Sequence, residues 1–496
     1  MINVNSLKRH ILDLALKGKL VSQREEDGSA ADMLSSFEQM KINQKSKKVK
    51  RAKEFSEIDD TEIPFEIPKN WVWCRWGKLL DVFSGVSYDK GDISNTGLRI
   101  LRGGNIQNNL IELNDSDVFL PEKYFDDEKI IRKGDTIIVA STGSRELIGK
   151  PAYVKEEIPN TMVGAFLRIC RPKFLELSDF FNVIFQSSLY RTHIRDASKG
   201  TNINNIKETY ITLMPIPLPP IAEQRRIIEK INSIFGELDE VDRKINRLNT
   251  IESIFEKKII QLGVEGKLTE SLSFDDADNF LNYSRSCKRE LNNSGVLKGR
   301  KTKPLLDIKE DDYPHAIPSR WKWIRLGDVC EIFGRIGFRG YTTGDIVQKG
   351  EGAITISPSN INSKGETDFN ECTYLSWEKY EESPEIMIFE DDVLLVKTGS
   401  SYGKPGIVKN LPQKATINPQ LAVLKYITCN KEFLNYVLLS DSSQKQFEDF
   451  VVGTAIPTFS QEKLANLLIP MPSLDEQIAI ASKISEILSI FRNSIT

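Results

Sequence analysis

Apolar residues recur at alternating steps of four and three along the middle of the chain. The members of this series are Ile227, Ile231, Ile234, Leu238, Val241, Ile245 and Leu248. This spacing is typical of a heptad seam, which places these side chains on one face of an α-helix. We predict a helix from Ala222 to Gly263, which at 1.5 Å per residue would be roughly 60 Å long. A helix longer than a globular core needs favours a spacer.

Shorter apolar runs lie on both sides of this helix. Thr136–Val139 and Val393–Val396 are two of them, and Gly, Asn and Asp turns separate such runs. This pattern is typical of strands. Two later stretches, 177–193 and 431–450, predict helices. We expect an α+β fold with two similar domains, each containing a curved, mostly antiparallel sheet and flanking helices.

The chain contains one module twice. IPFEIPKNWVWCRWGKLLDVF from Ile63 matches YPHAIPSRWKWIRLGDVCEIF from Tyr313. Further along, STGSRELIGKPAYV from Ser141 matches KTGSSYGKPGIV from Lys397. A third pair of matching segments begins at Ser198 and Val451. Matches that keep the same order along the chain indicate an internal duplication.

The duplication is predicted to be circularly permuted. The second copy begins its helix with Ile480, Ile484 and Ile487, but the chain stops at Thr496, and SLKRHILDLALKGKL near the N-terminus matches IFEKKIIQLGVEGKL in the central helix. We expect the two termini together to complete one long helix, antiparallel to the central one. This coiled-coil spacer would give the molecule a pseudo-two-fold axis. The alternative is two independent copies in tandem, which would place a complete helix after each copy.

These patterns predict the domain boundaries. In chain order, we expect an N-terminal helix that completes the C-terminal repeat (1–22), a polar linker (23–62), the first α+β domain (63–220), the central helix (221–268), a second polar linker (269–312), the second α+β domain (313–472) and a C-terminal helix (473–496). Both linkers contain a basic run followed by an acidic one. Such composition is typical of flexible, solvated chain.

Composition limits the class of protein. The 496 residues are 40% hydrophobic and 28% charged, with no apolar run near the ~20 residues of a membrane span and no signal peptide pattern. The six cysteines form no C-x-x-C pair, and there are only three histidines. We therefore expect a cytoplasmic protein with no membrane segment and no metal site. The formal net charge of −3 does not by itself indicate a nucleic-acid partner, so DNA binding would depend on local patches.

Motifs for catalysis are weak. The segment 143–150 resembles a phosphate loop, but it has one residue too many between its glycines, and Pro151 stands where Ser or Thr would bind magnesium. The glycines of 334–340 do not fit a dinucleotide fingerprint. We predict no catalytic residue. The alternative is a methyltransferase or nuclease with a cofactor or metal motif in unfamiliar form.

Two Gly-rich turns gather groups that suit phosphate oxygens. Their candidate residues are Thr142, Ser144, Arg145 and Lys150 in the first copy, and Thr398, Ser400, Ser401, Tyr402 and Lys404 in the second. The alternative is an ordinary polar hairpin. The five tryptophans of the repeated opening segments, Trp71, Trp73, Trp76, Trp321 and Trp323, could stack on bases, but their alternation with apolar strand positions favours packing.

Other loops carry side chains that could bind base edges. The candidates are Lys90, Arg99, Arg102, Asn105, Lys199, Thr201, Asn202 and Asn204 in the first copy, and Arg335, Arg339, Tyr341, Ser357, Asn360, Thr454 and Thr458 in the second. Taken singly, each is better explained as a solvated surface residue. The frameworks match while the loops differ, as two domains that read different sequences would require.

With these motifs the chain resembles the specificity subunit of Type I restriction-modification systems. The motifs are Gly18-Lys19-Leu20 and Gly266-Lys267-Leu268, the Ile-Pro-x-x-Trp segments at Ile67 and Ile317, and the Pro-x-Pro segments followed by Glu223-Gln224 and Glu476-Gln477. The resemblance implies two target recognition domains that read a split, asymmetric site in double-stranded DNA, held apart by conserved helices.

The resemblance also implies partners. Two methyltransferase subunits would bind S-adenosylmethionine and methylate adenines, and restriction subunits would use ATP and Mg for translocation and cleavage. This chain would then be non-catalytic and carry no cofactor. A second alternative is a scaffold whose helices bridge other proteins without reading DNA.

Overall fold

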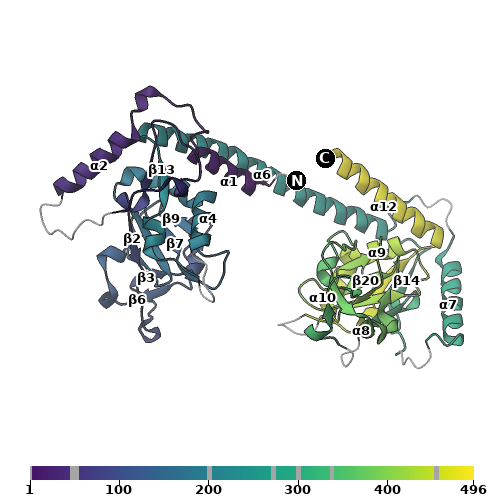
Figure 1. The fold of residues 1–496 in the computed structure, drawn as a ribbon. Coiled ribbons are helices and arrows are strands. Elements are labelled where there is room, and N and C mark those ends of the chain that lie inside the picture. Colours follow the sequence, from purple (N-terminus) through teal and green to yellow (C-terminus); the bar gives the residue numbers. More distant parts are fainter. Residues whose placement is uncertain are drawn as a thin grey trace. The chain divides into compact units, whose positions relative to one another are not determined.

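The computed structural model describes residues 3–44, 55–197, 204–269, 275–297, 303–335, 340–451 and 457–495. It comprises two compact units, residues 1–246 and 247–496. Helix α6 (Ile221–Val264) begins in the first unit and ends in the second (Figure 1). Its 44 residues confirm the predicted long central helix, and its length is consistent with a spacer.

The first unit is built around a four-stranded antiparallel sheet in the order β2 (Leu80–Ser84), β11 (Leu167–Pro172), β7 (Thr136–Val139) and β9 (Pro151–Tyr153). A second sheet has the order β10 (Thr161–Val163), β3 (Leu98–Leu101) and β6 (Val118–Leu120), in which β10 and β3 are parallel. The remaining ladders join β1 (Val72–Arg75) to β13 (Pro215–Leu218), β8 (Ser141–Thr142) to β12 (Asn204–Asn205) and β4 (Ile106–Gln107) to β5 (Leu110–Ile111). The helices are α1 (Val4–Leu16), α2 (Ala30–Gln44), α3 (Ser178–Gln186), α4 (Ser188–Ala197) and α5 (Glu208–Thr212).

The second unit repeats this architecture. Its four-stranded sheet has the order β15 (Glu331–Gly334), β23 (Leu421–Lys425), β20 (Val393–Val396) and β21 (Pro405–Ile407). Its other sheet has the order β16 (Ile346–Val347), β18 (Thr373–Ser376), β17 (Gly352–Ile356), β22 (Ala415–Ile417) and β19 (Met387–Ile388), again with one parallel pair, β17 and β22. β14 (Lys322–Arg325) pairs with β24 (Leu468–Met471), and the helices are α7 (Ala277–Asn293), α8 (Trp377–Glu381), α9 (Lys431–Leu439), α10 (Asp441–Phe450), α11 (Gln461–Ala465) and α12 (Leu474–Ile495). The predicted α+β class, the mostly antiparallel sheets and the duplication are confirmed.

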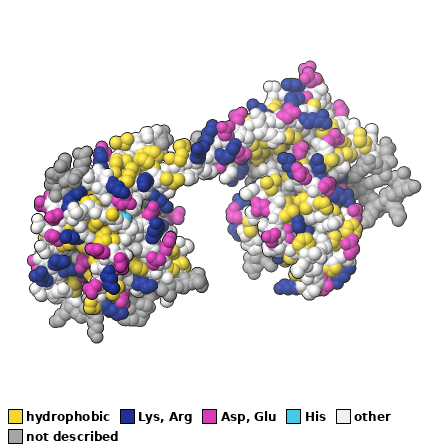
Figure 2. All heavy atoms as spheres, turned by 180° about the vertical axis from the view of Figure 1, so that it is seen from behind, with side chains coloured by type: hydrophobic (Ala, Val, Ile, Leu, Met, Phe, Trp, Pro, Cys, Tyr) yellow, Lys and Arg dark blue, Asp and Glu magenta, His cyan; other side chains and the backbone are white. Residues whose placement is uncertain are grey.

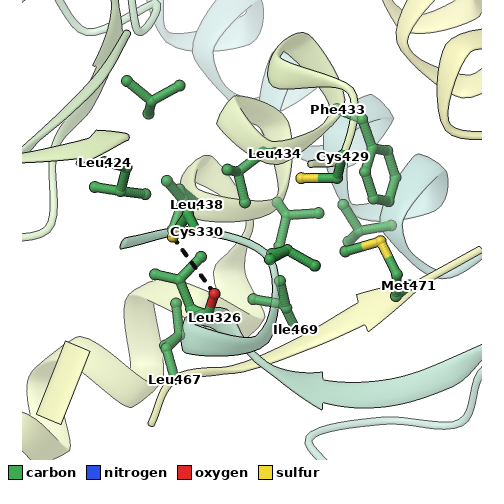
Figure 3. Close-up of a cluster of buried hydrophobic side chains, with 14 of the residues drawn as sticks. Leu326, Cys330, Leu424, Cys429, Phe433, Leu434, Leu438, Leu467, Ile469 and Met471 are labelled. Carbon is green, nitrogen blue, oxygen red and sulfur yellow. Dashed lines mark hydrogen bonds between the residues drawn. The ribbon is translucent and has the colours of Figure 1, made fainter. Parts of the chain in front are cut away.

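The central strand β20 is apolar and buried at every position because both sides of its sheet are covered. Since successive side chains of a strand point to opposite faces, Val393 and Leu395 of β20 join the core beneath α9, whereas Leu394 and Val396 face the second sheet. The core on the helix side contains Phe433, Leu434 and Met471 (Figure 3). There the thiol of Cys330 donates to the carbonyl of Leu326 at 3.4 Å.

Each unit also contains a short antiparallel helix pair. In the first, Lys8 of α1 forms an ion pair with Asp239 of α6 and lies over the ring of Phe235. In the second, the rings of Phe255 in α6 and Phe491 in α12 stack with centroids 4.2 Å apart. The predicted pairing with the central helix is therefore present for the N-terminal helix in the first unit and for the C-terminal helix in the second. The pseudo-two-fold axis, and one helix completed by both termini, stay predictions.

Two expectations from the sequence need correction. Each stretch predicted as one helix, 177–193 and 431–450, is two helices, because a serine between them ends one helix and caps the next. The hydroxyl of Ser440, for example, accepts from the amide of Ser443 at 3.4 Å. The segments predicted as polar linkers also contain helices α2 and α7, since each has apolar residues at helical spacing that pack on its unit, such as Phe37 and Phe280.

Candidate DNA-recognition surface

The Gly-Lys-Leu motifs close the helices that enter each domain. Gly18 and Gly266 have φ of +65° and +70°, a left-handed conformation that glycine adopts without strain. The next amide, of Lys19 or Lys267, donates back into the helix at 2.9 Å, to Leu14 or Leu262. This is a Schellman-type helix end. The motif therefore turns the chain from the helix toward the domain and has a framework role.

The Trp and Glu-Gln motifs meet in the fold although about 150 residues separate them in sequence. The indole nitrogen of Trp71 donates to Glu223 Oε2 at 2.9 Å, and Trp321 donates to Glu476 Oε2 at the same distance. Both glutamates are fully buried. Trp71, Trp76, Trp321 and Trp323 are buried as well. This burial confirms packing, rather than base stacking, for these four tryptophans.

The Gly-Lys-Pro turns are tied to their own domains. Lys150 Nζ donates to Gln107 Oε1 at 2.8 Å, and Lys404 Nζ donates to the carbonyl of Ile361. Burial lowers the pKa of Lys404 below its ordinary value. Because both ammonium groups already have acceptors inside the domain, their contacts favour a structural role over phosphate binding. They position the loops on either side of them.

Several other predicted site residues are also engaged within the domains. Asn105, 4% exposed, donates to the Glu112 carbonyl at 2.8 Å and to Asp117 at 2.6 Å. Asn360, its counterpart after β17, donates to the Glu371 carbonyl at 2.8 Å. Arg335, 6% exposed, donates to the Ile417 carbonyl at 3.2 Å. Burial of these groups favours framework roles.

Other candidates keep an accessible side chain. Lys90, Arg102, Arg145 and Ser400 are exposed, while Arg99, Thr142, Ser144, Tyr341, Ser357, Thr398, Ser401, Tyr402 and Thr458 are half-buried. Lys199, Thr201, Asn202, Arg339 and Thr454 lie outside the described residues, and Asn204 is described only by its backbone. On the face drawn in Figure 2, basic and acidic side chains are interspersed in each unit. Any phosphate binding on that face would therefore depend on local groups.

In each domain the fold brings two predicted loops together beside the end of the four-stranded sheet. In the first, Thr142 of β8 pairs with Asn204 of β12. In the second, Thr398 forms a bridge with Thr458, and their hydroxyls are 2.8 Å apart. We call this part of each domain the paired-loop surface: residues 141–145 with 204–205 in the first domain, and 397–402 with 457–458 in the second. It unites candidates that are about 60 residues apart in sequence.

A nearby helix holds each Gly-rich loop in place. Arg191 of α4 donates to the carbonyls of Glu146 and Ile148 at 3.0 and 3.2 Å, and burial lowers its pKa. In the second domain Gln444 of α10 donates to the carbonyl of Gly403 at 2.9 Å. Such support reduces the entropy that a loop loses on binding a ligand. The sequence alone did not single out these two residues, because nothing in it shows which loop a helix faces.

The fold places one further side chain beside the paired-loop surface. Phe166 lies in the turn between β10 and β11, and its carbonyl accepts from the amides of Ala140 and Ser141 at 2.8 and 3.1 Å. Its side chain is 69% exposed. The available signal was an aromatic residue in a Gly-Ala-Phe turn between two strands, where a polar residue is usual.

Comparisons with known proteins agree with this arrangement. The model of the Type I restriction modification DNA specificity domain matches residues 68–252 and 318–496. The chain belongs to this specificity family. It is 33% identical over 210 residues to the Type I restriction enzyme EcoKI specificity subunit of Escherichia coli K12, and 30% identical over 212 residues to the StySPI specificity subunit of Salmonella potsdam. These alignments cover 41% and 42% of this chain, and they span about half, 45%, of each relative.

A solved structure also shares the fold of this specificity subunit. It comes from work on complex assembly and conformational transition of the type I R-M system, with 18% sequence identity and a TM-score of 0.50, and the match covers 87% of this chain and 94% of the other. The likeness extends across both specificity domains. Each domain of the family match therefore corresponds to one of the two α+β units.

Two properties of the described residues bear on other classes of function. Among the described residues, no group of three or more His, Cys, Asp or Glu side chains is placed to hold a metal ion. None of the described helices is both long enough and apolar enough to cross a membrane.

Proposed function

We propose that this specificity subunit reads a bipartite, asymmetric DNA sequence, one half with each domain, and directs partner subunits that modify or cleave DNA. One observation carries the proposal. The two domains share equivalent hydrogen bonds, such as Trp71 to Glu223 and Trp321 to Glu476, but they present different side chains on the paired-loop surface. Ser144 and Arg145 follow Thr142 in the first, whereas Ser400, Ser401 and Tyr402 follow Thr398 in the second. Hydroxyls and guanidinium groups of this kind bind phosphates and base edges.

The division of labour follows from the same proposal. Two methyltransferase subunits would bind this chain and S-adenosylmethionine, and they would methylate one adenine in each half-site. Restriction subunits would use ATP and Mg. The chain itself would be non-catalytic, would act in the cytoplasm, and would read half-sites about one helical turn apart, ~34 Å, as two-domain readers on one face of DNA do.

The deciding experiment maps N6-methyladenine across the genome of cells that express this chain with its methyltransferase subunits, and of cells in which the chain is deleted. We expect a two-part motif with a fixed gap that disappears on deletion. Unchanged methylation in the deletion strain would overturn the proposal and favour a scaffold.

A loop exchange tests the assignment of one half-site to each domain. Residues 142–148 of the first domain are replaced by residues 398–402 of the second, which leaves the Gly-Lys-Pro framework intact in the first. We expect a changed requirement in one half of the motif and an unaltered other half. Changes in both halves would contradict separate readers.

A further inference from the structure

The turn that contains Phe166 has a counterpart in the second domain. There the carbonyl of Gln420 accepts from the amides of Lys397 and Thr398 at 2.8 and 3.3 Å, as the carbonyl of Phe166 does from Ala140 and Ser141. The following strands also agree in register, since Leu167 pairs with Val139 and Leu421 with Val396. Phe166 and Gln420 therefore occupy the same framework position.

The backbone at this position supports the fold, but the side chain does not. Any residue can supply the carbonyl that binds the two amides. The side chain of Phe166 is 69% exposed, and Gln420 is also exposed. An exposed phenyl ring gains little from packing, so core stability does not account for a phenylalanine here.

The chemistry at this position differs between the domains in the way that base recognition requires. A phenyl ring offers an apolar surface, which matches the C5-methyl group of thymine in the major groove. A glutamine amide offers a donor and an acceptor, which match N7 and N6 of adenine. The amide of Gln420 is also oriented, because its Oε1 accepts from Asn418 Nδ2 at 3.1 Å and its backbone amide donates to Asn418 Oδ1 at 2.9 Å.

The position is adjacent to the candidate loops. In the first domain the carbonyl of Phe166 is bound by Ser141, whose neighbour Thr142 pairs with Asn204. In the second the carbonyl of Gln420 is bound by Thr398, which bridges to Thr458. A double helix that touches the paired-loop surface would meet this turn as well.

We infer that Phe166 and Gln420 are equivalent specificity-determining residues, of which Phe166 selects a thymine in one half-site and Gln420 an adenine in the other. The inference rests on the proposed function and assigns to it one position in each domain.

Methylation mapping in cells that contain the methyltransferase subunits tests the inference with reciprocal variants. Phe166→Gln should change the requirement at one base pair of one half-site from thymine to adenine. Gln420→Phe should make the opposite change in the other half-site. Phe166→Leu is the matched control, since it keeps an apolar side chain and should keep thymine. Both substituted side chains are exposed, so the thermal midpoint should not move in any of the three variants.

A binding measurement tests the thymine methyl directly. When the selected thymine is replaced by deoxyuridine, the assembled wild-type complex should bind about fourfold more weakly, the value expected for one buried methyl group. The Phe166→Gln complex should not distinguish the two DNAs. A wild-type two-part motif that both reciprocal variants retain would overturn this inference alone, whereas a wild type with no two-part motif would overturn the proposed function together with it.

Discussion

Each unit buries a glutamate at the start of a long helix, Glu223 in α6 and Glu476 in α12. The two equivalent glutamates have different hydrogen-bond partners. Glu476 accepts from Arg320 Nε and Thr269 Oγ1, each at 3.0 Å, in addition to Trp321. Glu223 accepts from Trp71 and, at 3.2 Å, from Asn70 Nδ2, and its Oε1 has no hydrogen-bond partner among the described residues. The difference teaches that the family motif fixes the acceptor, while each domain has its own way of balancing the buried charge.

The largest expected effect comes from removing the better-paired carboxylate. Glu476→Ala leaves the guanidinium of Arg320 without its partner in a nearly buried site, which should cost about 3–5 kcal/mol. Glu223→Ala leaves only neutral donors unpaired and should cost about 1–3 kcal/mol. Hydrogen–deuterium exchange, with peptides from residues 68–76 and 318–326, measures each unit separately, as a chain of two units requires.

A double substitution sharpens this comparison. Arg320→Asn with Thr269→Val gives Glu476 the surroundings that Glu223 has, because Asn70 and Val21 stand at the matching positions. In this background the cost of Glu476→Ala should fall to that of Glu223→Ala. A cost that stays at the wild-type level would show that the Arg320 ion pair is not the source of the difference.

A second, smaller effect concerns the glycines at which the two units agree. A Cβ added at Gly18 would lie 2.3 Å from Pro68 Cγ, and one at Gly266 would lie 2.6 Å from Pro318 Cγ. Gly18→Ala and Gly266→Ala should therefore each cost about 2–4 kcal/mol, from backbone strain and overpacking together. Protection of the adjoining helix from hydrogen exchange is the measurement.

Gly295, which follows the end of helix α7, provides the matched control for these substitutions. Its φ is +78°, and a Cβ there would meet no atom within 4 Å. Gly295→Ala should cost only the strain, about 1 kcal/mol. Equal losses at Gly18 and Gly295 would mean that the contact with Pro68 does not matter.

The sequence predicted the parts of the fold that depend on local pattern. The heptad series gave the long helix because its period is a property of neighbouring residues. The matched motifs gave the duplication. The break at Ser440 was not predicted, because a serine cap looks like any other polar residue until the next helix is known to start there.

The candidate surface was harder to predict than the fold. The Thr-Gly-Ser turns were found from their residue types, but the pairing of Thr398 with Thr458 depends on the path of the chain through the sheet. Residue type also misled where a side chain is buried: Asn105 and Arg335 suit base edges, yet their donors are used inside the domain. Phe166 was missed for the opposite reason, since an aromatic residue suggests a core.

The smallest expected effect concerns the segment before the first strand of each domain, residues 55–62 in the first and 305–312 in the second. We call it the lead-in segment. Arg75 binds Glu62 at 2.7 Å and the carbonyls of Ser56 and Glu57, and it lowers the pKa of Glu62 to about 2. The matching Arg325 binds the carbonyls of Leu306 and Asp307 at 3.2 and 3.0 Å. Backbone carbonyls do not titrate in this range, whereas a carboxylate does.

Acid should therefore loosen the first lead-in segment and spare the second. Because the pKa of Glu62 is lowered by folding, its contribution is complete above about pH 4.5, the ordinary value of a glutamate, and is lost as the pH falls toward about 2. The carboxylate is partly exposed, so the loss should stay below about 1 kcal/mol. Exchange protection of residues 55–62, corrected for intrinsic rates, should fall between pH 5 and pH 3 while that of 305–312 holds. Glu62→Gln should reduce this pH dependence to the part that comes from Asp59, whose pKa is also lowered, by its hydrogen bonds with Thr61. A pH dependence that is unchanged in that variant would show that Glu62 is not its source.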